Sequence, residues 1–179
     1  MKTITLFFAL ILFAACAQPV QVTQQTQPAD PLQGIKQTVR NKFPEVKQLS
    51  TNDLDAWLKD TNRQPPLLLD ARSTNEYAVS HLHRAKFAGD ASQLATILKD
   101  QPKDQPIVAY CAVGYRSSAL SEKLKQLGYT NVANLEGSIF QWANEGRPVY
   151  KGEQVVKQVH PFDAKWGEML KPEVRAPLP

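Results

Sequence analysis

Residues 106–117 read PIVAYCAVGYRS, which predicts a buried strand, a short loop and the start of a helix. The apolar run at residues 106–110 is typical of a parallel strand covered on both faces. From Ser117 to Leu127 the apolar side chains recur on one helical face, and Gly128 follows where a glycine commonly ends a helix. Cys111 therefore stands at the carboxyl end of a strand, just ahead of a helix.

The same alternation of strand and helix extends along the chain in both directions. The predicted strands are residues 46–49, 67–69, 106–110 and 131–135, and the predicted helices are residues 51–58, 73–77, 92–98, 117–127 and 139–144. Residues 51–53 offer the caps for the first of these helices. Parallel strands need crossover connections, which helices usually supply. The sequence therefore predicts an α/β fold, a parallel sheet with helices on both faces.

The loop after residue 110 carries reactive chemistry. Ligands of open parallel sheets bind beyond the carboxyl ends of the strands, where Cys111 is placed. A loop curled around Gly114 can turn its N–H groups toward an anion, as can the start of the helix, and Arg116 adds a positive charge. These groups favour the thiolate, which is the nucleophilic form of cysteine. The alternative is an inert core cysteine at a strand end, with Arg116 a solvated surface charge.

The stretch from Tyr110 to Ser117 resembles the active-site loop of the rhodanese family of sulfurtransferases. Two other segments resemble segments of that family. The first is LDAR at residues 69–72, followed by EY at 76–77 and HL at 81–82. The second is NLEG at residues 134–137, followed by Trp142, Gly146 and Pro148. The resemblance implies a rhodanese-like domain at residues 44–150. Ser80, Arg84 and Ser138 stand where the family commonly has glycine, which calls the local turn geometry and the choice of substrate into question.

The resemblance also implies an activity that needs no cofactor. Cys111 would take the outer sulfur of a small anionic donor such as thiosulfate, become a persulfide and pass the sulfur to a thiol or cyanide-like acceptor, while Arg116 orients the donor. The implied substrate-binding residues are Ala112, Val113, Gly114, Tyr115 and Ser117. Asp70 and Arg72, at the end of a strand, are expected to support neighbouring loops.

Two other functions fit parts of this pattern. A phosphatase or arsenate reductase of the same superfamily has a loop one residue longer, whereas four residues separate Cys111 from Arg116 here. A non-catalytic module that binds a persulfide or a protein partner near the membrane is the second alternative, and the intact cysteine counts against it. His81 and His83 have no third ligand at suitable spacing, so a metal site is not expected. Trp142 is expected in the core.

The N-terminus predicts export. Lys2 precedes an apolar run at residues 4–13, which has signal-peptide length and is too short to span a bilayer. Residues 13–16 read FAAC, which resembles the bacterial lipoprotein signal that is cleaved before its cysteine. We therefore expect residues 1–15 to be a signal peptide and Cys16 to carry lipid. The lipid would anchor the protein to a membrane of the bacterial cell envelope, facing the periplasm or on the outer surface. An ordinary secretory signal or an uncleaved anchor would leave Cys16 without a role.

The two ends of the mature chain are expected to be accessory to the domain. Residues 16–43 are predicted to be a flexible tether, since their first half is rich in Gln, Thr and Pro. Residues 151–179 are predicted to be an extension on the surface. The net charge is +4 and its basic residues are scattered, so nucleic acid is not an expected partner. Cys111 is expected to be a free thiol, because its one possible partner, Cys16, would be acylated.

Overall fold

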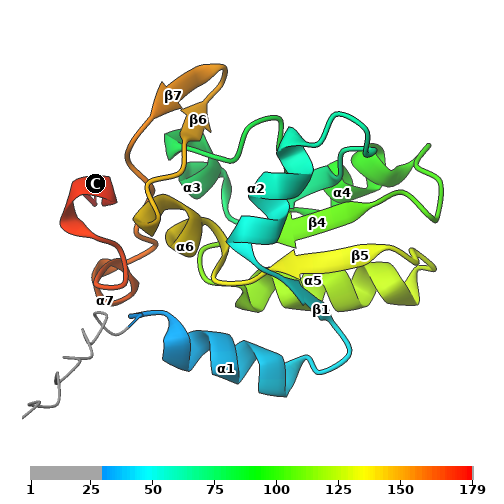
Figure 1. Cartoon of the computed structure of the whole chain (residues 1–179), viewed down its shortest axis with the longest axis horizontal. Coiled ribbons are helices and arrows are strands. Elements are labelled where there is room, and N and C mark those ends of the chain that lie inside the picture. Colours follow the sequence, from blue (N-terminus) through cyan, green and yellow to red (C-terminus); the bar gives the residue numbers. More distant parts are fainter. Residues whose placement is uncertain (1–29, 179) are drawn as a thin grey trace, which may run out of the picture.

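Five strands form a parallel sheet in the order β1-β5-β4-β2-β3, and two more form an antiparallel hairpin (Figure 1). The computed structural model describes residues 30–178. The strands are β1 Lys47–Leu49, β2 Leu67–Asp70, β3 Lys86–Phe87, β4 Ile107–Tyr110, β5 Val132–Leu135, β6 Val149–Lys151 and β7 Gln154–Val156. The helices are α1 Gln33–Lys42, α2 Thr51–Lys59, α3 Thr74–Val79, α4 Ala91–Leu98, α5 Tyr115–Gln126, α6 Ser138–Asn144 and α7 Ala164–Gly167, followed by the 3₁₀ turn η1 Pro172–Val174.

Helices cover both faces of the sheet, as predicted. Side chains of successive strand residues point to opposite faces, so each central strand contributes to two hydrophobic clusters. One cluster joins strand residues such as Leu68 and Val108 to α2 and α6, and the other joins Leu69 and Ala109 to α4 and α5. Because both faces are buried, the central strands are mainly apolar, and Asp70 in β2 and Asn134 in β5 are buried polar exceptions.

Three local predictions need correction. Ser50, and not a residue of the 51–53 segment, caps α2, because its side chain accepts the backbone N–H of Asp53. Strand β3 was missed, since two residues are too short to show a period. Helix α5 begins at Tyr115 rather than Ser117, because Gly114 is its N-cap. The helix start is therefore two residues closer to Cys111 than the sequence predicted.

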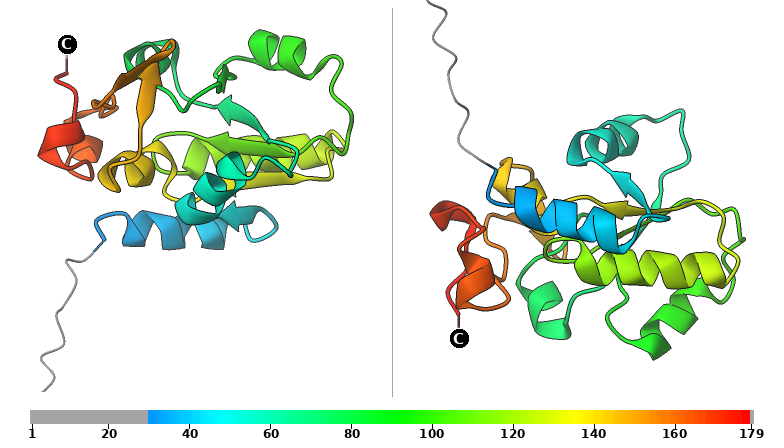
Figure 2. Two further views of the ribbon diagram at one scale, coloured as in Figure 1. Left: turned by 45° about the horizontal axis from the view of Figure 1, so that its top comes forward. Right: turned by 90° about the horizontal axis from the view of Figure 1, so that it is seen from below.

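The predicted tether is wrong for its second half. Residues 33–42 form α1, and Val39 on that helix joins Phe43 and Val46 in a third buried cluster, with Ile35 packed against it. The polar composition of the segment concealed this apolar stripe. Figure 2 shows α1 running beside α5. The signal peptide, Cys16 and the rest of the predicted tether lie outside the described residues.

The C-terminal segment is more than a surface extension. After the β6–β7 hairpin, Val159 and Leu170 are almost fully buried and belong to the same core cluster as α2 and α6. Val159 also pairs by backbone hydrogen bonds with Val174 and Ala176, which closes the segment on itself. The segment thus brings α7 to the carboxyl edge of the sheet, near α1 (Figure 1).

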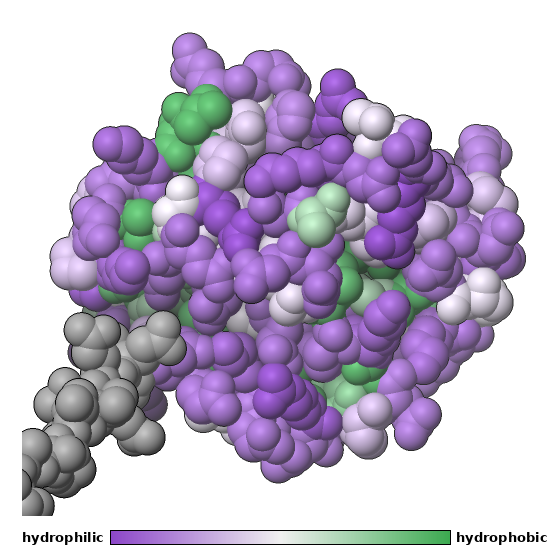
Figure 3. All heavy atoms as spheres, in the orientation of Figure 1, coloured by the Kyte–Doolittle hydropathy of each residue, from purple (hydrophilic) through white to green (hydrophobic). Residues whose placement is uncertain are grey.

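The surface in the orientation of Figure 3 is mostly hydrophilic, with small, separate hydrophobic patches. Among residues 30–178, no helix has both the length and the apolar character needed to cross a bilayer.

Candidate active site

Cys111 directly follows β4 and stands three residues before Gly114, the N-cap of α5. Only 1% of the residue surface is exposed, and its thiol is free within the part of the chain described here. The backbone N–H of Gly114 donates a hydrogen bond to Cys111 Sγ over 3.2 Å. The first N–H groups of a helix lack partners within the helix and carry partial positive charge. The sulfur therefore lies where the backbone stabilises a negative charge.

Gly114 makes this approach possible. Its φ of +108° is a left-handed conformation that residues with a Cβ rarely adopt. A Cβ at this position would also lie 3.3 Å from the side-chain amide nitrogen of Asn134, a tight contact. The loop can thus turn back on Cys111 and start α5 within three residues only because residue 114 is glycine.

Arg116 is held by Glu76 of α3. The guanidinium donates two hydrogen bonds to the carboxylate, Nη1 to Oε2 over 2.8 Å and Nη2 to Oε1 over 2.7 Å. Burial by itself lowers the pKa of Arg116, but the hydrogen bonds to Glu76 and the electrostatic interaction with Cys111 outweigh it and raise that pKa. Burial likewise raises the pKa of Glu76, yet Arg116 and the Ser73 N–H together bring it below its ordinary value. The cation beside Cys111 is therefore fixed in position and stays charged.

Ser138, at the start of α6, positions the backbone of Cys111. Its hydroxyl accepts the Cys111 N–H over 3.1 Å and donates to the Leu135 carbonyl over 3.0 Å. The residue is fully buried and its φ is +52°. A non-glycine residue in this region is under backbone strain of about 1–2 kcal/mol. The strained serine thus supplies a hydrogen bond to the cysteine that glycine could not.

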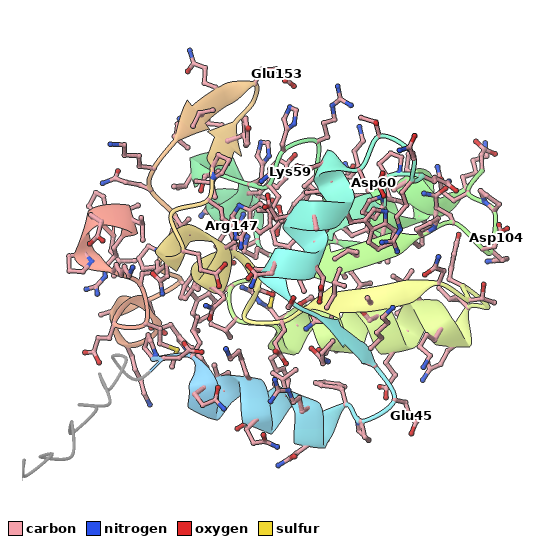
Figure 4. All side chains as sticks on the ribbon, in the orientation of Figure 1. Glu45, Lys59, Asp60, Asp104, Arg147 and Glu153 are labelled. Carbon is pink, nitrogen blue, oxygen red and sulfur yellow. The ribbon has the colours of Figure 1, made fainter. Side chains whose placement is uncertain are left out.

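A cavity of about 390 Å³ opens above Cys111. The side chains that line it come from α1, the cysteine loop, the start of α5, and α7 with the segment that leads into it. They are Ile35, Thr38, Cys111, Ala112, Val113, Tyr115, Arg116, Phe162 and Trp166. Asp104, labelled in Figure 4, lies in the loop before β4 and so marks the opposite, amino-terminal edge of the sheet. The cavity lies at the carboxyl edge, where ligands of such sheets bind.

Comparison with known proteins agrees with this geometry. Residues 50–145, more than half of the chain, match the family model described as the rhodanese-like domain. The chain belongs to the rhodanese-like family. The matched range holds β2, the cysteine loop and α6, but neither α1 nor α7. The rhodanese-like fold predicted from the sequence is therefore confirmed, and the two outer walls of the cavity come from outside the matched range.

Relatives of this rhodanese-like chain differ in their described activities. A sulfurtransferase of Allochromatium vinosum is 34% identical over 113 residues, which are 60% of this chain and 98% of that protein. A tRNA uridine(34) hydroxylase of Erwinia tasmaniensis is 31% identical over 138 residues, and the match spans 72% of this chain but only 37% of that protein. Thiosulfate sulfurtransferase from Pseudomonas aeruginosa shares the fold, with a TM-score of 0.54 and 18% identity over 78% of this chain and 26% of that one.

The structure brings most of the residues expected at the rhodanese-like site together. Ala112 and Val113 line the cavity, and Tyr115 stands at its rim, with its ring edge-on to Phe43 at 5.2 Å. Gly114 is not among the residues that line the cavity, but its backbone N–H donates to Cys111 Sγ. Ser117 does not face the cavity: it is fully buried in α5. The early start of α5 turns its hydroxyl toward β5, where it donates to Asn134 Oδ1 over 2.6 Å.

Asp70 and Arg72 form a buried ion pair below the site. Arg72 donates to both carboxylate oxygens of Asp70, with the shortest distance 2.7 Å, and also to the carbonyl of Ser80. Both side chains are fully buried. Burial lowers the pKa of Arg72, but the charge and hydrogen bonds of Asp70, together with Tyr110 and Glu76, outweigh it and raise that pKa. The pair joins the end of β2 to the turn after α3, so it supports the segment that carries Glu76.

The two histidines near this turn do not form a metal site. The imidazole of His81 stacks on Tyr77 at 4.3 Å between centroids, and its Nδ1 lies 3.0 Å from the Leu82 carbonyl. His83 faces Glu153 at the tip of the hairpin. Within residues 30–178, no group of three His, Cys, Asp or Glu side chains is placed to hold an ion.

Arg84 and Ser138 are two of the three positions where the sequence resemblance implied glycine, and their φ values are positive, at 58° and 52°. The third, Ser80, is extended. The left-handed turns are therefore retained at both positions despite the added Cβ.

The sequence reasoning missed Glu76 as a residue of the candidate site. Its spacing from Ser73 is that of a capping box, which could have predicted that its carboxylate is held at the start of α3.

Proposed function

We propose that this protein is a sulfurtransferase in which Cys111 carries the transferred sulfur as a persulfide. The observation that supports the proposal best is the setting of Cys111 Sγ, which accepts the Gly114 N–H at the start of α5 and lies in the field of Arg116. Membership of the rhodanese-like family and the sulfurtransferase among the relatives agree with it. The donor is a small sulfane-sulfur anion such as thiosulfate.

The reaction proceeds in two displacements. The Cys111 thiolate attacks the outer sulfur of thiosulfate, an S–S bond forms, and the bond to the inner sulfur breaks so that its electron pair leaves with sulfite. A thiolate or cyanide then attacks the outer persulfide sulfur, and the electron pair of the breaking bond returns to Cys111 Sγ. Gly114 and the start of α5 stabilise the negative charge on sulfur, and Arg116 orients the anionic donor.

The length of the loop favours sulfur transfer over phosphate or arsenate chemistry. Four residues separate Cys111 from Arg116, one fewer than in the loop of a phosphatase or arsenate reductase of the same superfamily. Glu76 holds both terminal nitrogens of the guanidinium, which fixes the cation beside the sulfur. We therefore prefer sulfur transfer to phosphate or arsenate chemistry.

We further propose that the protein acts at a bacterial cell-envelope membrane, held by lipid on Cys16. The proposal rests on the N-terminal sequence alone.

Cyanide-dependent formation of thiocyanate from thiosulfate tests the activity. The wild-type protein is expected to turn over, and Cys111→Ser is expected to be inactive with an unchanged circular dichroism spectrum. Wild-type protein without activity toward thiosulfate or an organic persulfide, or a Cys111→Ser variant that retains it, would refute the proposal. Hydrolysis of p-nitrophenyl phosphate by the wild type would favour the phosphatase alternative.

A further inference from the structure

The cavity above Cys111 is mainly apolar. Six of the side chains that line it are aliphatic or aromatic: Ile35, Ala112, Val113, Tyr115, Phe162 and Trp166. Of the other three lining residues, Thr38 carries no charge, Cys111 supplies the sulfur, and Arg116 is the one cation in this lining. Its charge is matched by Glu76, whose side chain is only 1% exposed. Apart from the point next to the sulfur, the cavity therefore offers little to a charged ligand.

The cavity is also larger than the donor needs. A water molecule takes about 30 Å³ in the liquid, so 390 Å³ corresponds to roughly thirteen waters. Thiosulfate has five heavy atoms and fills well under half of that space. Binding cavities are usually matched in size to what they hold. The remaining volume suits an organic molecule on the order of ten heavy atoms.

Three of the six apolar side chains come from segments outside the family match. Ile35 lies on α1, and Phe162 and Trp166 lie on or next to α7, whereas the match covers residues 50–145. Phe162 has a φ of +70°, an uncommon and strained conformation for an aromatic residue. Its ring lies 5.2 Å from the guanidinium carbon of Arg116. The C-terminal segment thus holds an aromatic ring over the reactive end of the cavity.

We propose that the physiological sulfur acceptor is a small, uncharged organic thiol with an aromatic or branched aliphatic group. The inference rests on the proposed function and names its substrate class. The apolar group lies among Ile35, Phe162 and Trp166, and the thiolate reaches the outer sulfur on Cys111. The S–S bond to the acceptor forms as the bond to Cys111 Sγ breaks, so the products are the acceptor persulfide and the Cys111 thiolate. No oxidant or reductant is consumed.

The test compares acceptors on protein already loaded with sulfur. The full-length mature protein is treated with thiosulfate, desalted and mixed with 2-phenylethanethiol, 2-mercaptoethanol or mercaptoacetate, and intact mass spectrometry follows the loss of sulfur. Each rate is divided by the rate of the same thiol with a small-molecule persulfide, which removes differences in intrinsic reactivity. The normalised rate for 2-phenylethanethiol is expected to exceed both others by about tenfold or more, because its ring is buried.

Phe162→Ala and Leu127→Ala form a matched pair. Their wild-type side chains are 48% and 50% exposed, but Leu127 follows the far end of α5 and does not line the cavity. Phe162→Ala is expected to lower the preference for 2-phenylethanethiol several-fold, and Leu127→Ala to leave it unchanged. If loaded wild-type protein shows equal normalised rates for all three thiols, the inference is wrong while the sulfurtransferase proposal stands.

A binding measurement separates the two proposals. Calorimetry on the Cys111→Ser protein with benzyl methyl sulfide, which has no thiol, is expected to show saturable binding that Phe162→Ala weakens. Absence of binding overturns the inference whatever the transfer assay gives. Failure of every donor to load Cys111 refutes the proposed function instead, and with it the acceptor role of the cavity.

Discussion

Replacing Glu76 by glutamine removes the negative charge that holds Arg116 beside Cys111. The carboxylate accepts both guanidinium nitrogens at 2.7 and 2.8 Å and also the N–H and hydroxyl of Ser73, each at 2.9 Å. Glutamine can still accept from Ser73, but one of its two ends is an NH₂ donor that faces the cation. The chain offers a control: Arg40 and Glu136 also form a bidentate ion pair on the surface, through Nε and Nη2 at 2.7 and 2.8 Å.

The expected cost follows from the difference in burial. Breaking a fully buried ion pair costs about 3–5 kcal/mol. Glu76 is 1% exposed and Arg116 is 36% exposed, so water can partly compensate the arginine and we expect about 2–3 kcal/mol for Glu76→Gln. Glu136 and Arg40 are 18% and 42% exposed, and Glu136→Gln is expected to cost about 0.2–1 kcal/mol.

Equilibrium unfolding in urea measures both variants. Since the pKa of Glu76 is lowered in the folded protein, its stabilising effect is present above the unfolded value of about 4.3. That effect is lost as the pH falls through the folded value, so the difference between wild type and Glu76→Gln is expected to shrink in acid. Equal costs for Glu76→Gln and Glu136→Gln, or a Glu76 effect independent of pH, would show that the buried pair does not hold Arg116.

Three further changes have defined outcomes. Arg116→Lys is expected to lower kcat/KM for thiosulfate by about 10- to 100-fold, because an ammonium cannot keep the bidentate bond to Glu76; unchanged steady-state kinetics would contradict this. Ser138→Ala leaves the buried Cys111 N–H without its partner and is expected to cost about 1–3 kcal/mol in urea unfolding and to slow the alkylation of Cys111 by iodoacetamide. A variant with wild-type stability and labelling would show that Ser138 does not position the cysteine. Cys16→Ser is expected to abolish incorporation of labelled palmitate and to release the protein from membranes, and continued labelling would rule out lipid on this cysteine.

The sequence predicted the sheet well because its central strands are buried on both faces. Continuous apolar runs marked β2 and β4, and turn residues separated the strands from the helices. The cysteine loop was also visible, since strand, cysteine, glycine and arginine lie within one short stretch. The start of α5 was placed two residues late because the helix was recognised by the apolar side chains after Ser117, whereas Gly114 is its N-cap and Ser117 is already buried within it.

Contacts between distant segments were beyond the reach of local patterns. Glu76 and Arg116 are 40 residues apart, and nothing in the spacing of charges pairs them. Phe162 and Trp166 lie in a proline-containing segment without periodicity, and Ile35 lies in a stretch whose composition suggested a tether. The sequence thus located the candidate cysteine, while the shape and polarity of the cavity around it depend on tertiary packing.

The most direct test of the account is the mass of the intact protein after treatment with thiosulfate and removal of excess reagent. The account predicts a gain of one sulfur atom that cyanide removes and that is absent from the Cys111→Ser protein. An unchanged mass after treatment with thiosulfate and with an organic persulfide, or a gain that persists in Cys111→Ser, would contradict the assignment of Cys111 as the sulfur carrier.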